Sequence, residues 1–437
     1  MTATSTPHGV GIGSIECAAL CAPLVVTLAF GIASGNAHWI FWAGLWPSLI
    51  IPPFLMLFSG RDRPTDSAIT PRSALVIVCL ASLAIIAGVS AFVVDPSQLS
   101  IIQWLGTYVS PLLVYLGLQV TPFTRRLFVA TWIAVTIGAL IPLIAGIVAY
   151  YSEWGVPTGL ELLTSRYDTE RMNGYMRATF GNTGNTAAYL ALLIPPWFAF
   201  LIARNASGGP RVLYVVALTV ALAHVLIVES RTLFIVLITV LPLVTYFYRV
   251  RFAFSIVGLI VASSLVLLPL LEAGDKALEL TFGAFEGTSE DQSLTERLEA
   301  MQIGLGLMFD NPALGVGPGN SAKVHIYTSA HQYWINQGEE IGVLGLILSV
   351  ALSVAVFWRF FSCIQARSIG TFRDRGFPGI AGAAGYMLYG CMANMALSST
   401  VVNAWIGLFA IMLALDSVRF SDLQDHRQGV GVGRVEQ

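Results

Sequence analysis

Four residues of this chain have side chains and surroundings suited to chemistry: Arg177, Arg231, Arg297 and His331. The arginines flank or separate long apolar segments, and the histidine lies in a polar stretch directly before another apolar segment. A guanidinium group offers a planar fork of donors that matches phosphate or carboxylate oxygens. An imidazole has an unperturbed pKa of about 6.5, so it can accept a proton near neutral pH. These residue types suit the binding of an anionic group and the removal of a proton.

Each of these residues also has an ordinary structural interpretation. Arg231 ends a polar break between two apolar segments, where it could extend to the membrane interface or pair with Glu229. Arg297 could pair with Glu296 or Glu299 on a solvated helix face. A single histidine is more often a hydrogen-bonded structural residue than a catalyst. Taken one at a time, the residues leave both interpretations open.

The composition places these residues in a membrane protein. Of the 437 residues, 56% are hydrophobic and 11% are charged, whereas soluble globular proteins carry roughly 25% charged residues. The formal net charge is −2 and no basic run suggests nucleic-acid binding. The five cysteines lie in or beside apolar segments, so we expect neither a disulfide framework nor a zinc site. The first apolar run lacks a basic leader and is long enough to span, so we expect a retained helix.

Long apolar runs predict about twelve membrane-spanning helices. A span needs about 20 mostly apolar residues, because the hydrocarbon core is roughly 30 Å thick. Pro195 and Pro196 in the sixth run are tolerated because neighbouring helices can satisfy the freed carbonyl groups. We therefore expect an all-α bundle that forms one polytopic membrane domain over residues 1–437. The predicted spans are 14–34, 39–59, 73–94, 101–120, 127–150, 187–203, 212–229, 232–248, 252–271, 337–358, 377–397 and 400–418.

The basic residues predict the orientation of this bundle. Sixteen of the 23 lysines and arginines fall in the loops after even-numbered spans or in the C-terminal tail. Cytoplasmic loops carry such an excess, so both termini are expected in the cytoplasm. Arg63, Arg126, Arg251 and Arg373 are then on the cytoplasmic side, opposite His331. The seven exceptions are Arg166, Arg171, Arg177, Arg231, Lys276, Arg297 and Lys323.

Two long segments, 151–186 and 272–336, lie on the predicted outer side. The second contains an expected amphipathic helix from Leu294 to Met308, followed by a glycine- and proline-rich turn. The turn Gly315-Val-Gly-Pro-Gly319 is not a P-loop, because no Lys-Ser or Lys-Thr follows it. We expect it to form a tight turn that returns the polar loop over the membrane.

Four short motifs follow one another along residues 177–345. They are Arg177-Ala-Thr-Phe-Gly-Asn-Thr-Gly-Asn185, Glu229-Ser-Arg231-Thr, Arg297 with Asp310-Asn-Pro-Ala-Leu-Gly-Val-Gly-Pro-Gly319, and Ala330-His331-Gln with Gly338-Glu-Glu-Ile-Gly-Val-Leu-Gly345. In this order they resemble the O-antigen ligase and polymerase superfamily of membrane glycosyltransferases. The glycine spacing of the first motif departs from the family pattern, and Gln332 stands where the family usually has asparagine.

This resemblance implies a transferase that moves a preassembled glycan from undecaprenyl diphosphate to an acceptor hydroxyl. It implies that Arg231 and Arg297, with Arg177 as a third member, bind the pyrophosphate and stabilise its growing charge. It also implies that His331 is the general base in a direct displacement with inversion at the anomeric carbon. The site would face the periplasm from the bacterial inner membrane, with 272–336 as a periplasmic loop and membrane lipids around the bundle.

We expect no metal and no other cofactor. Glu339 and Glu340 are adjacent rather than spaced as ligands, and we expect them at the positive N-terminal end of a helix. The outer segments hold no His/Asp cluster with coordination spacing.

Three functions remain open on the sequence. We favour ligation of the glycan to lipid A-core. A polymerase of O-antigen or exopolysaccharide repeat units would use the same residues, with a second lipid-linked glycan as the acceptor. Twelve spans also suit a secondary transporter, which places ionisable groups near the bilayer midplane. The candidates for that role, Glu16, His224 and Asp416, form no cluster in the sequence.

Overall fold

The computed structural model describes ten parts of the chain: residues 71–120, 125–151, 183–203, 211–228, 230–248, 292–321, 330, 332–365, 371–393 and 409–413. All of these residues lie in helices or in the turns and short stretches that adjoin them, and none lies in a strand. The expected all-α fold is therefore confirmed over this part of the chain.

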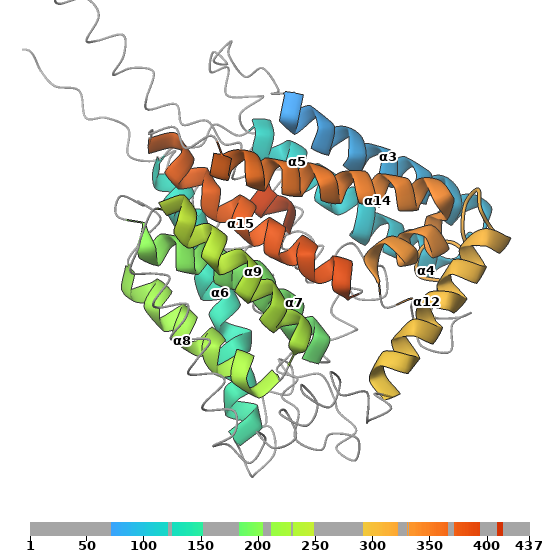
Figure 1. Ribbon diagram of the computed structural model, residues 1–437. Helices are drawn as coiled ribbons and strands as arrows, with labels where there is room; N and C mark the ends of the chain where they lie inside the picture. Colours follow the sequence, from blue (N-terminus) through green and yellow to red (C-terminus); the bar gives the residue numbers. More distant parts are fainter. Residues whose placement is uncertain are drawn as a thin grey trace, which may run out of the picture.

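The helices follow the apolar runs of the sequence (Figure 1). Eight predicted spans, the third to the eighth, the tenth and the eleventh, overlap described helices. The first, second and ninth lie outside the described residues, and the twelfth is described only as helix over 409–413. The elements are α3 (Pro71–Val93), α4 (Gln98–Trp104), the π-helical turn η1 (Leu105–Val109), α5 (Ser110–Val120), α6 (Arg125–Tyr151), α7 (Thr183–Ile202), α8 (Arg211–Val228), α9 (Arg231–Tyr248), α12 (Gln292–Asp310), α14 (Tyr333–Gln365) and α15 (Thr371–Met392).

Several of these helices can cross a membrane. Four segments are long and apolar enough: Ala74–Val93, Ser100–Gln119, Leu127–Ile144 and Tyr333–Gln365. Three shorter helices, Thr186–Ile202, Arg211–Val225 and Thr232–Tyr248, are also apolar. The chain is thus a multi-pass membrane protein, while the number twelve and the cytoplasmic position of the termini stay predictions.

Helix α15 joins two groups of helices. It contacts α14 on one side, which packs on α3, and α7 and α9 on the other side, where α8 and α6 follow. Helix α12 packs on α14 and leads away from the bundle (Figure 1). At one end of α15 the ring of Phe377 stacks on Phe247, with 3.7 Å between centroids, and lies 5.7 Å from Phe360. These contacts gather the C-terminal ends of α9 and α14 around the N-terminal end of α15.

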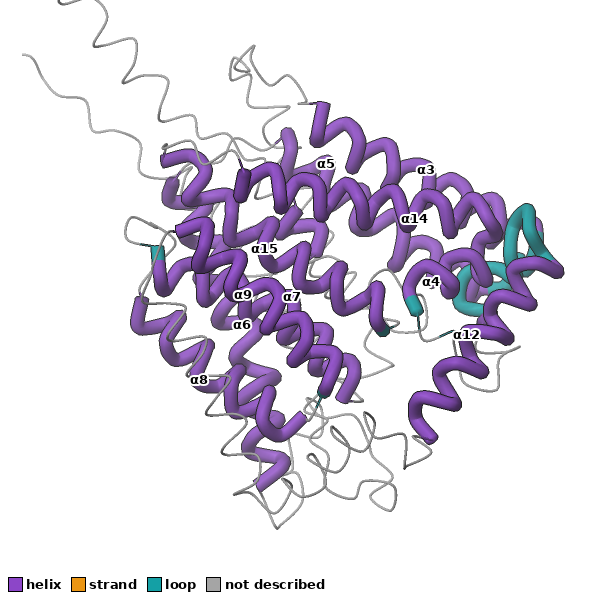
Figure 2. Tube along the Cα trace, in the orientation of Figure 1, coloured by secondary structure: helices purple, strands orange, loops and turns teal. Residues whose placement is uncertain are grey.

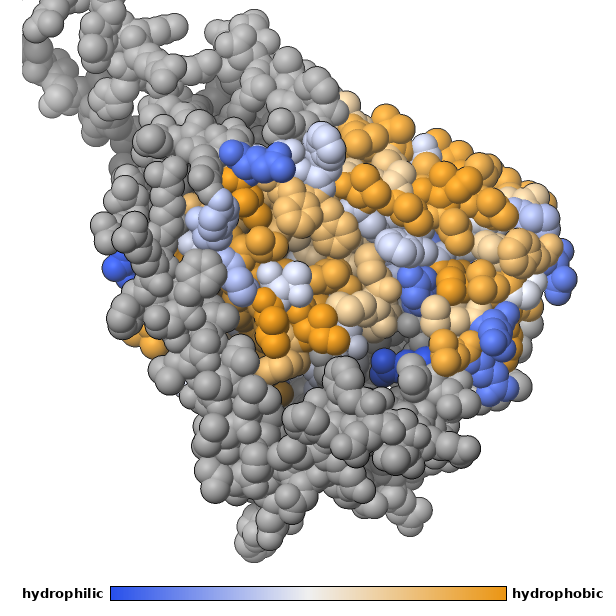
Figure 3. Space-filling model, in the orientation of Figure 1, coloured by the Kyte–Doolittle hydropathy of each residue, from blue (hydrophilic) through white to orange (hydrophobic). Residues whose placement is uncertain are grey.

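The outward faces of α3 and α14 carry large apolar side chains. Ile85 is 67% exposed on α3, and Trp358 is 67% exposed on α14. Figure 3 shows an apolar surface over α3 and α14, whereas hydrophilic residues gather over α12. An apolar face of this kind is unfavourable in water and suits contact with lipid tails.

The two prolines of α7 are matched by two glycines of α15. Proline at position 195 or 196 removes the helical hydrogen bond to the carbonyl four residues earlier, on Ala191 or Leu192. A Cβ on Gly385 would lie 2.5 Å from the Ala191 oxygen, and a Cβ on Gly382 would lie 2.5 Å from the Leu192 oxygen. The absence of side chains therefore lets α15 approach the freed carbonyl groups, as the sequence predicts for prolines within a span.

Helix α14 is interrupted near its beginning, and the preceding turn packs into the interruption. Ile341 and Gly342 have non-helical backbone angles, with φ of 80° at Gly342. The amides of Val316 and Gly317 donate to the carbonyl oxygens of Glu339 and Glu340, at 2.9 and 3.0 Å. The amide of Val343 donates to the Pro312 oxygen at 2.9 Å.

The turn needs its glycines. Gly315, Gly317 and Gly319 have φ of 63°, 96° and 76°, a region that favours glycine. A Cβ on Gly315 would overlap the Glu339 and Glu340 backbone. The predicted tight turn is confirmed, and it closes onto α14 beside α3 and α4 (Figure 2).

The prediction that Glu339 and Glu340 lie at the N-terminal end of a helix is wrong. They are the seventh and eighth residues of α14, directly before the interruption, and both are buried. Tyr108 donates to one Glu340 oxygen at 3.2 Å and Ser321 to the other at 2.9 Å. The reason is that α14 begins at Tyr333, four residues before the predicted start, so that Glu340 lies within hydrogen-bond distance of Tyr108 in η1.

Candidate functional site

Arg297 lies near the N-terminal end of α12, the helix predicted over Leu294 to Met308. Ala300, Gly304 and Met308 follow it at spacings of three and four residues, which places all four on one helical stripe. Met308 and Gly304 face residues 330–339, so this stripe faces α14. Ala300 is buried but Arg297 is exposed.

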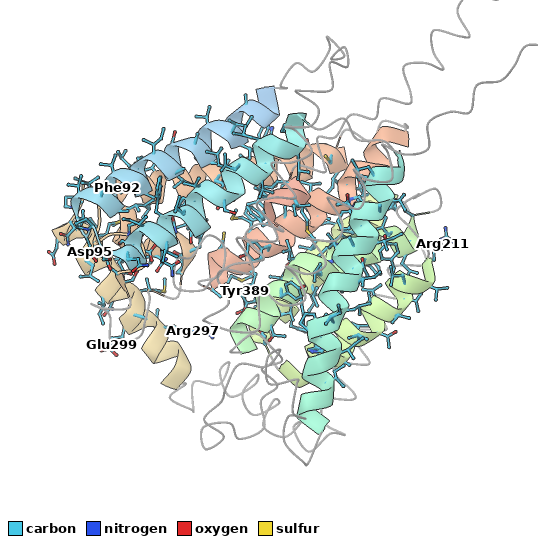
Figure 4. The ribbon with its side chains drawn as sticks, turned by 180° about the vertical axis from the view of Figure 1, so that it is seen from behind. Phe92, Asp95, Arg211, Arg297, Glu299 and Tyr389 are labelled. Carbon is cyan, nitrogen blue, oxygen red and sulfur yellow. The ribbon has the colours of Figure 1, made fainter. Side chains whose placement is uncertain are left out.

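Arg297 lies on the side of α12 that faces the C-terminal end of α15 (Figure 4). Its positive charge is within electrostatic range of the Tyr389 hydroxyl. Glu299 lies on the opposite side of α12, as expected for residues two positions apart on a helix. The structure therefore favours an arginine that faces the bundle over a pairing with Glu299.

Tyr389 brings two further helices to this point. Its hydroxyl donates to the Gly184 carbonyl oxygen at 3.1 Å, at the N-terminal end of α7. It also lies close to the Ser230 side chain, where α15 packs on α9. Tyr389 itself is 2% exposed. A buried hydroxyl of α15 thus links the first turn of α7 to the residue that precedes α9.

Ser230 directly precedes α9 and caps its N-terminal end. The Leu233 amide donates to the Ser230 hydroxyl oxygen at 3.3 Å, the contact of an N-cap residue. Arg231 is the first residue of α9. The predicted middle-span motif therefore opens a helix beside Tyr389. The structure describes the backbone of Arg231 and not its side chain.

The two chain neighbours of His331 lie at the junction of α12, α14 and α15. The Ile335 amide donates to Gln332 Oε1 at 2.8 Å, and Gln332 Nε2 donates to the Cys391 carbonyl oxygen at 3.3 Å. Ala330 is fully buried, and a Cβ on Gly304 would lie 2.7 Å from the Ala330 Cβ. Residues 330 and 332 are thus held against three helices.

The last turn of α15 is therefore the meeting point of the site. Tyr389 donates a hydrogen bond to α7 and lies beside the N-cap of α9, within electrostatic range of Arg297. Two residues later, the Cys391 carbonyl oxygen accepts a hydrogen bond from Gln332. Of the four residues singled out in the sequence, Arg297 alone has a described side chain. Arg177 and His331 lie outside the described residues, so the convergence of all four side chains stays a prediction.

Two members of this junction were missed in the sequence. Tyr389 is one of 14 tyrosines and lies within an apolar span, where nothing marks it. Gln332 stands where the family motif has asparagine, so the sequence assigns it no role. Its contact with Cys391, 59 residues away, is a product of the fold and has no signature in the sequence.

Glu339 is a buried carboxylate beside this junction. A Cβ on Gly304 would lie 3.1 Å from its Oε2, and the Ala330 amide is its near polar neighbour. Neither carboxylate oxygen has a hydrogen bond of normal geometry within the described part of the chain. In the same part of the chain, no group of three or more His, Cys, Asp and Glu residues could hold a metal ion. Metal independence stays a prediction.

Comparison with known families matches part of this junction to a family. Residues 215–350 match the family model described as O-antigen ligase. The match includes most of α8, all of α9 and α12, the glycine-rich turn and the start of α14, and it contains Arg231, Arg297 and His331. Arg177 and Tyr389 lie outside it. A comparison with curated proteins finds no match. The match over residues 215–350 supports the resemblance to the O-antigen ligase and polymerase superfamily, whose members are glycosyltransferase-like enzymes that act on lipid-linked glycans.

Proposed function

We propose that this protein is a membrane glycosyltransferase of the O-antigen ligase type. It transfers a preassembled glycan from undecaprenyl diphosphate to lipid A-core at the periplasmic face of the inner membrane. The observation that carries the proposal is the meeting of Arg297, the N-cap of α9 and the flanks of His331 at the last turn of α15.

The arginines bind and stabilise the departing pyrophosphate. Arg231 and Arg297, assisted by Arg177, offer fixed positive charge and paired donors to its oxygens. Negative charge grows on the bridging oxygen as the bond to the sugar breaks, so these charges stabilise the transition state more than the bound donor. Arg297 is exposed and faces the junction. This position makes its guanidinium group accessible to a lipid-linked substrate.

His331 removes the proton of the acceptor. The acceptor oxygen forms a bond to the anomeric carbon as the bond from that carbon to the diphosphate oxygen breaks. The electron pair of the broken bond leaves with the diphosphate, and the hydroxyl proton passes to the imidazole. Attack from the face opposite the leaving group inverts the anomeric configuration. The diphosphate leaves without a protonated acid, so two glycosidase-type carboxylates are not required.

The test is transfer by the purified protein in detergent or vesicles. The donor is a glycan linked to undecaprenyl diphosphate, offered with lipid A-core or with a second lipid-linked repeat unit. Ligase activity gives glycan on lipid A-core. Product only with the second repeat unit would replace the ligase by a polymerase. Absence of product with either acceptor, together with movement of an intact solute across the vesicle membrane, would contradict both and favour a transporter.

A further inference from the structure

The Tyr389 hydroxyl occupies a central place in the junction, yet it belongs to neither the arginine set nor the proton-transfer step. We propose that Tyr389 is a positioning residue that holds the N-terminal end of α9, and with it Arg231, opposite Arg297. This inference rests on the proposed function and names a residue that tunes its pyrophosphate site.

The hydrogen bonds of the hydroxyl show how it can act. A tyrosine hydroxyl has one proton to donate and lone pairs to accept with. The proton is used toward the Gly184 carbonyl oxygen at 3.1 Å. The oxygen lies close to the Ser230 side chain and within electrostatic range of the positive charge of Arg297. The hydroxyl thus bonds α15 to α7 and lies beside the residue that caps α9.

The burial of Tyr389 assigns it to positioning rather than to catalysis. It is 2% exposed, so a glycan or pyrophosphate cannot contact it without displacing protein. Ser230 is the residue directly before Arg231 and caps the helix that Arg231 begins. A shift of Ser230 is therefore transmitted to Arg231 through one peptide bond. Loss of the hydroxyl leaves the Gly184 carbonyl and the Ser230 side chain to find other partners.

The first test is Tyr389→Phe, with Tyr115→Phe as the matched control. Tyr115 is also fully buried, and its hydroxyl has no hydrogen-bond partner among the described residues. We expect Tyr389→Phe to weaken binding of the undecaprenyl-diphosphate-linked donor about tenfold, the effect of about 1.4 kcal/mol from one buried hydrogen-bonding group. Inorganic pyrophosphate should inhibit transfer less strongly by a similar factor. The control should change neither value. Unchanged donor binding in Tyr389→Phe would overturn the inference.

The second test asks whether Tyr389 acts through the arginines. Arg297→Lys keeps the charge and loses the fork. If Tyr389 positions the arginine pair, donor binding in the double variant should fall by less than the product of the two single effects. If the loss of donor affinity in the double variant equals the product of the two single losses, the two residues act independently, and this would contradict the proposal.

A third variant keeps the proposal testable if Tyr389→Phe fails to fold. Ser230→Gly removes the hydroxyl that meets Tyr389, and glycine is a tolerated N-cap that costs only a few tenths of a kcal/mol. We expect weaker donor binding with a nearly unchanged unfolding temperature. Wild-type donor binding in this folded variant would overturn the inference. If the unaltered protein transfers no glycan, the proposed function itself is wrong. If the unaltered protein is active and the Tyr389 variant binds donor normally, only the role of Tyr389 is wrong.

Discussion

The side chain of Gln332 joins the beginning of α14 to the end of α15. Its Oε1 accepts from the Ile335 amide at 2.8 Å, and its Nε2 donates to the Cys391 carbonyl oxygen at 3.3 Å. One residue therefore caps the helix that follows His331 and fastens it to the helix that carries Tyr389. The amide of Gln332 supplies both the acceptor for the cap and the donor for the bridge.

We expect Gln332→Ala to lower both stability and transfer. Loss of a cap typically costs about 1 kcal/mol, and loss of the bridge separates residue 332 from the end of α15. Thermal unfolding in detergent and the transfer rate, measured on the same preparation, check the two effects. Gln302→Ala is the control, because Gln302 is exposed on α12. A Gln332→Ala protein with wild-type transfer would show that the bridge does not position the site.

Two glycines on α12 should respond differently to alanine. A Cβ on Gly304 would lie 2.7 Å from the Ala330 Cβ, whereas a Cβ on Gly306 would meet nothing within 4 Å. We expect Gly304→Ala to separate α12 from residue 330 and to lower transfer at least tenfold, with a stability loss of about 1–3 kcal/mol from overpacking. Gly306→Ala should keep activity and stabilise the helix by about 0.5–1 kcal/mol. Equal behaviour of the two variants in transfer and unfolding assays would refute the close packing.

Much of the fold follows from local pattern, and this is where sequence prediction succeeds. The seventh and eighth spans, predicted at 212–229 and 232–248, are α8 (Arg211–Val228) and α9 (Arg231–Tyr248). Their ends are predictable because arginines and short polar stretches bound each apolar run, and burial of charge in lipid is costly. The amphipathic pattern likewise predicted α12.

What the sequence could not reveal depends on contacts between distant segments. The glycines at 315–319 predict a tight turn, but not that its amides bind the carbonyl groups released by the interruption in α14. The sequence predicts Glu340 at the N-terminal end of a helix, yet Tyr108, 232 residues away, donates to it. The surroundings of Tyr389, which are α7, the N-cap of α9 and the charge of Arg297 on α12, form only in the folded protein.

The contact between Tyr108 and Glu340 should contribute to stability. Tyr108→Phe leaves a buried carboxylate with one donor fewer, so we expect the free energy of unfolding to fall by about 1–3 kcal/mol. Tyr115→Phe, which removes a buried hydroxyl without a described partner, should have little effect. The comparison is made by denaturant or thermal unfolding in one detergent. If the two variants are equally stable, the Glu340 contact contributes nothing measurable.

The arginines should be separable from the base by their effect on donor binding. We expect Arg231→Lys and Arg297→Lys to weaken donor binding as well as turnover, because lysine retains the charge but not the paired donors. A loss of about tenfold or more in affinity is expected for a charge-assisted contact worth about 1.5–3 kcal/mol. Binding of the lipid-diphosphate donor, measured without acceptor, tests this. Normal affinity in both variants would remove the arginines from the pyrophosphate site.

The central claim, that His331 is the base of a glycan transfer, is tested most directly by His331→Ala. The measurement is the single-turnover rate of transfer at saturating donor, with donor binding determined in parallel on the same folded protein. The account predicts that the rate falls by about 10²–10⁴, the usual contribution of a general base, while donor affinity stays near that of the wild type. Transfer at near wild-type rate would remove His331 from the base role. A folded variant that no longer binds donor would place His331 in the pyrophosphate site and leave the acceptor proton to another group.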